Sequence, residues 1–385
     1  MSELPSFVSP LPQKLVYGSG SIERLGELTA DFGTSALVVI GGSSLARSGN
    51  LDRALARLQA AGVKHDVFSG VPAEPTLEWV DKGRQRCEEV GAEVIIGIGG
   101  GSVMDVAKAI GALAREAEPT AVYHRGEQKI TQPGVPLIAC PTTSGTGAEV
   151  TPNSVLTDPE RGRKASLRGG DLMHRVALVD PVLTRSCPPQ QTAYSGLDAI
   201  VQALESYVST GANPYTDALA LQALRLMAPS LERAVEDGED LQAREAMALG
   251  STMAGMALAC ARLGLVHGLA HPIGHLLHLP HGLVCGALMP TVMEFNLPVA
   301  GEKYATAAQA LGLEGDDPAE ALVEWFAELA RRVGVEGLPG LEQLGEAELD
   351  SIVQEAMASG STKHNPRSVR EEHVRAMLAL LRATG

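Results

Sequence analysis

Aromatic side chains are scarce in this chain, which has five Phe, six Tyr and two Trp among 385 residues. Their scarcity argues against an aromatic-walled pocket for a large substrate and favours an aliphatic lining of Leu and Met. Basic residues are also in deficit, with 31 Lys and Arg against 46 Asp and Glu and a net charge of -15. Because binders of nucleic acid or anionic membranes need a basic face, we expect a small-molecule partner instead.

Cysteines are few and long apolar runs are missing. The five cysteines are odd in number, widely spaced and form no C-x-x-C pair; they are Cys87, Cys140, Cys187, Cys260 and Cys285. We expect buried free thiols in a reducing compartment. No apolar run reaches the about 18 to 20 residues of a membrane span, and no basic stretch followed by an apolar core opens the chain. The sequence therefore predicts a soluble, cytoplasmic protein.

The hydrophobic pattern divides the chain into two parts. Short apolar runs predict strands at 36–40, 65–69, 93–98, 136–140 and 176–180, with helices between them at 51–61, 75–91 and 102–115. This alternation is typical of a buried parallel sheet. Beyond Pro188, Ala/Leu-rich patterns predict helices at 192–209, 214–236, 240–271, 286–296, 302–311, 317–334, 345–358 and 369–382. We predict an α/β domain over 1–187 and an all-helical domain over 188–385, since one core rarely serves a chain of this length.

A glycine-rich segment, GIGGGSVMDVAKAIG at 97–111, follows a predicted strand and opens a helix. Backbone N–H groups at such a place can surround a phosphate, and Gly99, Gly100 and Gly101 let the chain approach a pyrophosphate closely. Ser102 as N-cap with Asp105 three residues later could instead form a capping box. Because Ser102 takes the third glycine position of G-x-G-x-x-G, the pattern supports phosphate binding and little more. Ser102 and Asp105 join the three glycines as candidate cofactor-binding residues.

A second loop, PTTSGTGAEVT at 141–151, offers the hydroxyls of Thr142, Thr143 and Thr146 between glycines. The loop could line a diphosphate or a ribose, or it could be an ordinary cluster of turns. Two such loops at the ends of parallel strands make a crevice of the kind that binds ligands in open α/β sheets.

The first predicted strand ends in Gly41, Gly42, Ser43 and Ser44, with Arg47 nearby and no acidic residue. An acidic residue at this place would accept hydrogen bonds from the ribose 2′-hydroxyl of NAD and repel the 2′-phosphate of NADP. Small hydroxyls and exposed N–H groups accept a 2′-phosphate, so the sequence favours NADP, with NAD as the alternative. A plain glycine-rich turn would leave the preference open.

Residues 264–282 hold five of the ten histidines, namely His267, His271, His275, His278 and His281. Such a density suggests a metal site or a proton relay, although any one histidine in an apolar helix could be a satisfied core residue. His267 and His271 are four apart near the end of a long predicted helix, which Pro272 is expected to end. We interpret His275 and His278 as core residues or neighbours of the ligands.

Upstream, Asp198 and Gln202 are four apart and therefore share one helix face. Asp198 alone could be an ordinary helix-face carboxylate. Together with His267 and His281 it forms a typical set for catalytic Zn²⁺ or Fe²⁺ that leaves a position open for a substrate oxygen. Gln202 could add a weak neutral oxygen ligand.

These motifs, in this order, resemble the iron-containing (group III) alcohol dehydrogenases, relatives of glycerol dehydrogenase and dehydroquinate synthase. The likeness covers essentially the whole chain and rests on 99–110, 141–151, 180–209, 212–221, 264–274, 279–282 and 364–367. The resemblance implies an N-terminal dinucleotide-binding α/β domain and a C-terminal helical domain, with the metal in the cleft between them. It also implies a homodimer or a larger assembly.

The resemblance carries over to individual positions. The metal ligands would be Asp198, Gln202, His267 and His281. Gln202 departs from the family pattern because it stands where the family has histidine, and an amide is a poorer donor to Fe²⁺ or Zn²⁺. Three strong ligands plus Gln202 or water would suffice. His271 would transfer a proton or position the substrate, and the cofactor would contact Gly99, Gly100, Gly101, Ser102, Thr142, Thr143, Thr146, Asn153 and Lys164.

The expected reaction is hydride transfer between NADP(H), or NAD(H), and a small alcohol or aldehyde, with a metal ion polarising the substrate oxygen. A metal-independent reductase similar to maleylacetate reductase is an alternative that Gln202 favours. A lyase similar to dehydroquinate synthase should show many basic groups near residues 198 and 267–281, and the sequence has no such cluster. A catalytically silent binding protein is disfavoured because the other motifs all persist.

Overall fold

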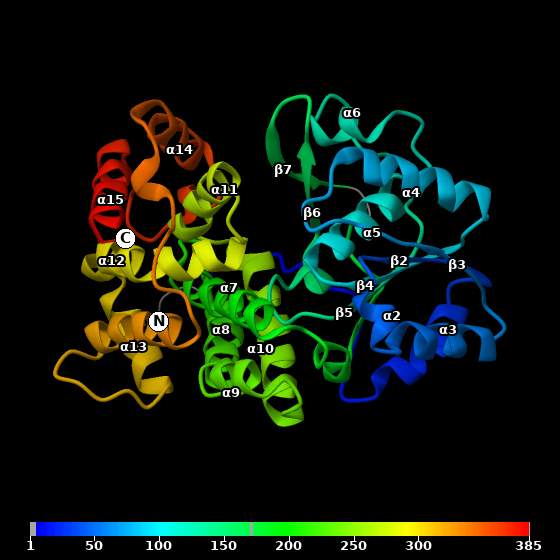
Figure 1. Ribbon diagram of the computed structural model, residues 1–385, viewed down its shortest axis with the longest axis horizontal. Helices are drawn as coiled ribbons and strands as arrows, with labels where there is room; N and C mark the ends of the chain where they lie inside the picture. The colour runs from blue at the N-terminus through cyan, green and yellow to red at the C-terminus, as the bar shows by residue number, and fades with distance from the viewer. Residues whose placement is uncertain (1–4, 170–171, 385) are drawn as a thin grey trace. The chain divides into compact units, whose positions relative to one another are not determined.

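The computed structural model describes residues 5–169 and 172–384, so residues 1–4, 170, 171 and 385 of the predicted domains lie outside the described part (Figure 1). The chain forms two compact units, one of which is Pro10–Cys187. The other unit contains the chain from Pro188 onward together with residues 5–9, which the sequence analysis assigned to the first domain. The ring of Phe7 stacks on Tyr215 with centroids 5.6 Å apart, a contact that removes apolar surface from water.

The Pro10–Cys187 unit is built on a six-stranded sheet with the order β1-β8-β5-β4-β2-β3. Its strands are β1 (Lys14–Tyr17), β2 (Ser35–Ile40), β3 (Lys64–Phe68), β4 (Val94–Gly99), β5 (Leu137–Pro141) and β8 (Val176–Val179). Every neighbouring pair is parallel. The predicted α/β class with a parallel sheet is therefore confirmed. The edge strand β1 was not predicted, because only Val16 of its four residues is buried and no apolar run marks it.

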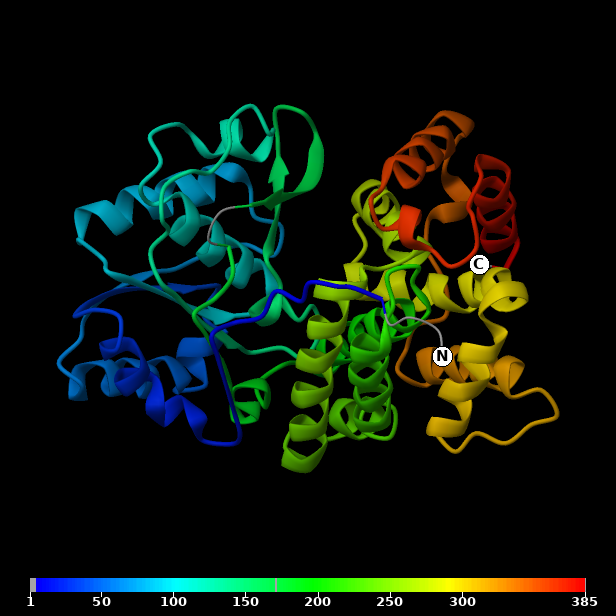
Figure 2. The ribbon, with the colours of Figure 1, turned by 180° about the vertical axis from the view of Figure 1, so that it is seen from behind.

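Helices cover both faces of this sheet, as Figures 1 and 2 show. One group is α1 (Leu25–Ala30), α2 (Ser44–Arg47) and α3 (Asn50–Ala60), and the other is α4 (Leu77–Glu89), α5 (Gly101–Leu113) and α6 (Thr120–His124). Along β2, Leu37 and Val39 pack in the α4 and α5 core, whereas Val38 and Ile40 pack in the α1 and α3 core. Burial on both faces explains why the strands are continuous apolar runs in the sequence.

A hairpin of β6 (Asn153–Asp158) and β7 (Arg163–Arg168) joins this unit and was not predicted. Its first residue is tied to α5 by Lys108, whose ammonium group donates to the carbonyl of Asn153 and to that of Ala148 at 3.1 Å. The side chain of Lys108 is fully buried, and its Nζ lies 3.1 Å from Asp105 Oδ1. A buried ion pair thus fixes the position of the segment that follows the threonine loop.

The second unit is helical. Its elements are α7 (Pro189–Val208), α8 (Pro214–Met227), α9 (Leu231–Glu236), α10 (Leu241–Ala261), α11 (Leu265–Leu277), α12 (His281–Ala310), α13 (Pro318–Arg332), α14 (Glu346–Ala358) and α15 (Glu371–Thr384). Their apolar faces share one core. Most of α7 is buried in that core, so polar side chains on it lie in a low-dielectric interior.

Several helix boundaries differ from the prediction. The predicted helix 240–271 is two helices, α10 and α11, that meet at 105°, and Arg262 between them has a φ of 71°. Pro272 lies inside α11 instead of ending it, and α12 runs through Pro298, joining two predicted helices. A proline removes one hydrogen bond of the helix ladder, and here the packed core outweighs that loss. The predicted helix 214–236 is likewise divided into α8 and α9.

The helix α12 is long and apolar enough to cross a membrane, as is the bent pair of α10 and α11, although the sequence analysis found no such run. Within α12, 56% of the apolar window is buried inside the protein. Core packing therefore accounts for much of its apolar character.

Candidate metal centre and cofactor loops

Four potential ligand atoms converge in the helical unit, all within 4.8 Å of one another. They come from Asp198 on α7, His267 on α11, and His281 and Cys285 on α12. Asp198 Oδ1 lies 3.2 Å from His267 Nε2 and 3.8 Å from His281 Nε2. Tetrahedral bonds of about 2.0 to 2.1 Å separate neighbouring ligand atoms by about 3.3 Å. The spacing of this donor set therefore fits a divalent metal ion.

Gln202 lies one helical turn after Asp198, and its Nε2 donates a hydrogen bond to Asp198 Oδ2 at 3.0 Å. Its Oε1 is buried and has no hydrogen-bond partner among the described residues. A buried oxygen without a partner is costly. A cation beside Asp198 would be a suitable partner, so the predicted role of Gln202 as a weak ligand fits this structure and stays a prediction.

Glu205 holds His267 in place, a role that sequence reasoning missed. Its two carboxylate oxygens accept hydrogen bonds from His267 Nδ1 at 2.6 Å and from the backbone N–H of Val266 at 2.7 Å. The second bond satisfies one of the free N–H groups at the start of α11. With Nδ1–H directed at Glu205, the other ring nitrogen is directed at Asp198, as in a metal-ligating histidine with a carboxylate behind it. The i, i+7 spacing from Asp198 was the available signal.

The electrostatics of this cluster are those of a site built for positive charge. Burial opposes a charged imidazole, but Cys285 and the carboxylates of Asp198 and Glu205 outweigh it and raise the pKa of His267 well above its usual value. Burial likewise opposes ionisation of Asp198, yet its contacts with His267, His281 and Gln202 lower its pKa. A metal ion would replace the proton held here, because ligation requires neutral imidazole.

Replacing Glu205 with Gln should weaken metal binding by about 10- to 100-fold, the usual cost of losing the carboxylate behind a ligating histidine. Competition with a chromophoric chelator measures this affinity. The exposed residue Glu294 on α12 provides the control variant Glu294→Gln, which should bind metal as the wild type does. Equal affinities for wild type and Glu205→Gln would show that Glu205 does not act on the centre.

The remaining histidines of the cluster separate into two kinds. The ring of His271 stacks on that of His281 with centroids 4.9 Å apart, so it lies beside the ligand atoms, and its catalytic role stays a prediction. His275 and His278 are exposed, which makes their interpretation as core residues wrong. They lie at the solvent-facing end of α11, where His278 ends the helix with a φ of 52°.

In the α/β unit, the loops singled out from the sequence follow the carboxyl ends of β2, β4 and β5. In the strand order β2 and β4 are neighbours. From β2 the chain moves to β3 at one edge of the sheet, and from β4 it moves to β5 in the direction of the other edge. The crevice of an open α/β sheet lies where the direction reverses in this way. Gly41–Ser44 follows β2 and Gly99–Ser102 ends and follows β4, so the two loops flank that position.

The glycine loop and the threonine loop touch each other. A Cβ added at Gly101 would lie 2.9 Å from Thr146 Oγ1, and one at Gly100 would lie 3.4 Å from Thr143 Oγ1. The backbone N–H of Thr142 donates to the carbonyl of Gly99 at 2.9 Å. Glycine at 101 thus permits the close approach of the two loops.

The capping box, which was the alternative interpretation of the glycine loop, is absent from the structure. The helix α5 begins at Gly101 with Gly100 as its N-cap, so Ser102 is no N-cap and forms no capping box with Asp105. The hydroxyl of Ser102 donates instead to the carbonyl of Ala73, and Asp105 pairs with Lys108.

The five other residues of the predicted cofactor set also lie in the α/β unit. Asn153 begins β6, while Lys164 on β7 pairs with Glu74 at 2.6 Å. Gly42, Ser43 and Ser44 are exposed, and Arg47 donates to the hydroxyl of Ser43. The contacts of these residues with a cofactor stay predictions.

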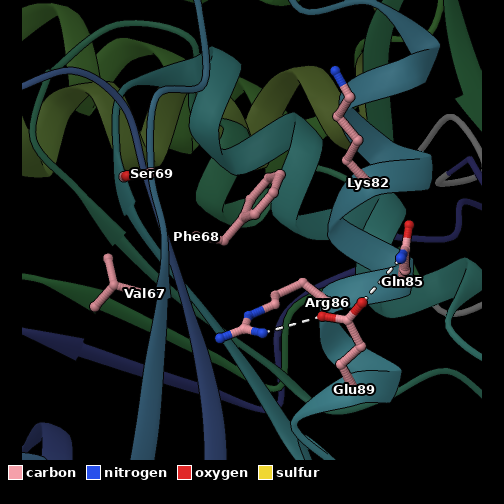
Figure 3. Close-up of a pocket in the computed structure, with 7 residues that line it drawn as sticks. All are labelled: Val67, Phe68, Ser69, Lys82, Gln85, Arg86 and Glu89. Carbon is pink, nitrogen blue, oxygen red and sulfur yellow. Dashed lines mark hydrogen bonds and ion pairs between the residues drawn. The ribbon is translucent and has the colours of Figure 1, made fainter.

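A surface depression lies apart from these residues, over β3 and α4 (Figure 3). Arg86 within it bonds to Asp66 at 2.7 and 2.9 Å and to Glu89 at 3.1 Å. Its cation therefore has carboxylate partners already, and no predicted site residue lines the depression.

A parallel sheet with glycine and threonine loops, and a helical unit with converging carboxylate, imidazole and thiol groups, are together features of a metal-dependent oxidoreductase. The family model for iron-containing alcohol dehydrogenases matches residues 12–181, and the model for the C-terminal region of that family matches residues 192–382. The chain belongs to the iron-containing alcohol dehydrogenase family. The resemblance found in the sequence is confirmed.

Individual relatives agree with this assignment. The chain is 36% identical over 364 residues to the probable alcohol dehydrogenase EutG of Escherichia coli K12, covering 94% of this chain and 92% of that protein. It is 34% identical to the NADPH-dependent butanol dehydrogenase of Clostridium saccharobutylicum, covering 95% of each. Among solved structures, a 1,3-propanediol oxidoreductase superposes with a TM-score of 0.93 at 33% identity, covering 98% of this chain and 100% of that one.

Proposed function

We propose that this protein is an NADP(H)-dependent alcohol dehydrogenase, or aldehyde reductase, for small substrates and that it uses Fe²⁺ or Zn²⁺. The observation that carries the proposal is the convergence of Asp198, His267 and His281 beside the unpartnered oxygen of Gln202. In this proposal residues 1–187 bind the dinucleotide and residues 188–385 bind the metal and the substrate. The metal cluster also disfavours the metal-independent alternative that Gln202 alone suggested.

The chemistry assigns a role to each side chain. When bound, the nicotinamide supplies or accepts a hydride and the metal ion polarises the substrate oxygen. Asp198, His267 and His281 would hold the ion, and Glu205 fixes the ring of His267 through Nδ1. His271, stacked on His281, would deliver a proton to the product oxygen, a role that suits an imidazole near neutral pH.

The cofactor loops support a dinucleotide in the α/β unit. The backbone of Gly99, Gly100 and Gly101 would face the diphosphate, with Ser102 and the threonines of 141–151 beside it. The exposed hydroxyl of Ser43 and the guanidinium of Arg47, which donates to it, would donate hydrogen bonds to the 2′-phosphate of NADP. The butanol dehydrogenase relative is likewise named as NADPH-dependent.

Replacing Arg47 with Ala should raise the KM for NADPH about 10- to 100-fold, because a charge-assisted hydrogen bond contributes about 1.5 to 3 kcal/mol. The KM for NADH should not change. Initial rates with both cofactors measure this, with Arg24→Ala as the control because Arg24 is also exposed and pairs with Glu27. Equal KM changes for NADH and NADPH would mean that Arg47 does not bind the 2′-phosphate.

The reaction class is tested by the initial rate of NADPH oxidation with a panel of short aldehydes, repeated with NADH. We expect turnover of several small aldehydes, with NADPH preferred. Tight NADPH binding without turnover of any aldehyde would contradict the proposed function, and a preference for NADH would contradict the NADP assignment.

We also propose a cytoplasmic protein that forms a homodimer or a larger assembly. All five cysteines are free thiols, which fits a reducing compartment. Cys187 and Cys260 are only half-buried, so the expectation that all five are buried was wrong. Sedimentation analysis would measure the assembly state.

A further inference from the structure

We propose that Cys285 is a fourth protein ligand of the metal ion and that its thiolate makes the centre prefer zinc to iron. The inference rests on the proposed metal-dependent function and concerns a residue that the sequence motifs did not single out. Cys285 lies one turn after His281 on α12, so both side chains share the face that meets α7 and α11.

The position of the sulfur supports ligation. Cys285 is fully buried, and its Sγ lies 3.5 Å from His281 Nε2 and 4.0 Å from His267 Nε2. In a tetrahedral site with metal–sulfur bonds of about 2.3 Å and metal–nitrogen bonds of about 2.0 to 2.1 Å, sulfur and nitrogen are separated by about 3.6 Å. The two sulfur–nitrogen distances are therefore close to those expected if Cys285 is a fourth ligand beside Asp198, His267 and His281.

The weakness of Gln202 as a metal ligand favours ligation by the sulfur of Cys285. The amide oxygen of Gln202 is a weak metal ligand. The amide nitrogen donates a hydrogen bond to Asp198 Oδ2 at 3.0 Å. A thiolate at 285 supplies the strong fourth donor that an amide at 202 does not. Thiolate is a soft ligand that suits Zn²⁺, and zinc also stands above Fe²⁺ in intrinsic affinity for such sites.

The binding step balances without a redox partner. The thiol of Cys285 releases its proton to solvent, and a sulfur lone pair forms the bond to the ion. The thiolate and the carboxylate of Asp198 together neutralise the two positive charges of the ion. Because zinc can expand to five ligands, four protein ligands still leave a place for the substrate oxygen.

Cobalt provides a direct test, because Co²⁺ bound by thiolate shows an intense near-ultraviolet charge-transfer band. We expect this band in the Co²⁺-loaded wild type, its loss in Cys285→Ala, and its retention in Cys87→Ala, which removes a buried thiol from the α/β unit. The zinc affinity of Cys285→Ala should fall at least about 100-fold, the upper limit for loss of a mere outer-shell partner. The Fe²⁺ affinity should fall less.

The outcomes separate this inference from the proposed function. A wild type that binds neither Co²⁺ nor Zn²⁺ would contradict the metal-dependent function itself. Stoichiometric Co²⁺ without the band, or equal zinc affinities of wild type and Cys285→Ala, would overturn only the role of Cys285. If Cys285→Ala does not fold, zinc-edge X-ray absorption of the wild type decides, because ligation predicts one sulfur at about 2.3 Å.

Discussion

Asp198→Asn is expected to lower kcat/KM for aldehyde reduction by about a thousandfold or more and to remove most of the bound metal. The Oδ1 atom of Asp198 lies within 4 Å of both imidazole Nε2 atoms, so it is the common point of the ligand set. Polarisation of the substrate oxygen contributes several kcal/mol, and each about 1.4 kcal/mol changes the rate tenfold. Metal content by elemental analysis and steady-state rates measure the two effects.

The asparagine variant keeps the volume of Asp198 and removes its charge, so the fold should persist. Asp217→Asn is the matched control, because Asp217 is a partly buried carboxylate of the same unit that pairs with Lys303 at 3.0 Å. That control should keep the metal and most of the activity. An Asp198→Asn protein with wild-type metal content would contradict the proposed ligand set.

Lys108→Met should destabilise the α/β unit by about 3 to 5 kcal/mol, the cost of leaving one member of a buried ion pair without its partner. Asp105 would remain in an interior where burial already raises its pKa. The carbonyls of Ala148 and Asn153 would also lose their donor.

Urea unfolding in a Trp325→Phe background measures this change, because Trp79 of α4 is then the only tryptophan. The double variant Asp105→Asn, Lys108→Met should recover part of the lost stability, since it removes the unpaired charge. Lys129→Met provides an exposed control in the same unit. A loss below about 1 kcal/mol in the single variant would show that Asp105 is neutral or hydrated in the folded protein.

Much of the fold follows from hydrophobic periodicity, because strands buried on both faces and long amphipathic helices leave strong patterns. The β6–β7 hairpin leaves a weak one, since β6 alternates between buried and partly exposed residues and β7 has only Leu167 buried. The break between α10 and α11 depends on the backbone of Arg262 at a φ of 71°, a conformation that no side-chain pattern encodes. The predicted gap between the helices 286–296 and 302–311 contains Pro298, and there the packed core sustains α12.

The site residues were likewise predictable only where local spacing along the chain marks them. Spacing of four placed Asp198 and Gln202 on one face, and the histidine motif supplied His267 and His281. Cys285 and Glu205 were within reach of the same reasoning, at i, i+4 and i, i+7 from known candidates. Their significance emerges only when α7, α11 and α12 pack together, because contacts between helices are set by tertiary structure and not by local sequence.

The most direct test of the metal-dependent function is the rate of NADPH oxidation with a small aldehyde before chelator dialysis, after it, and after anaerobic return of Fe²⁺ or Zn²⁺. The structure predicts that dialysis abolishes the rate and that one of these ions restores it. Full activity in protein shown by elemental analysis to be free of metal would contradict this account and would indicate a metal-independent reductase.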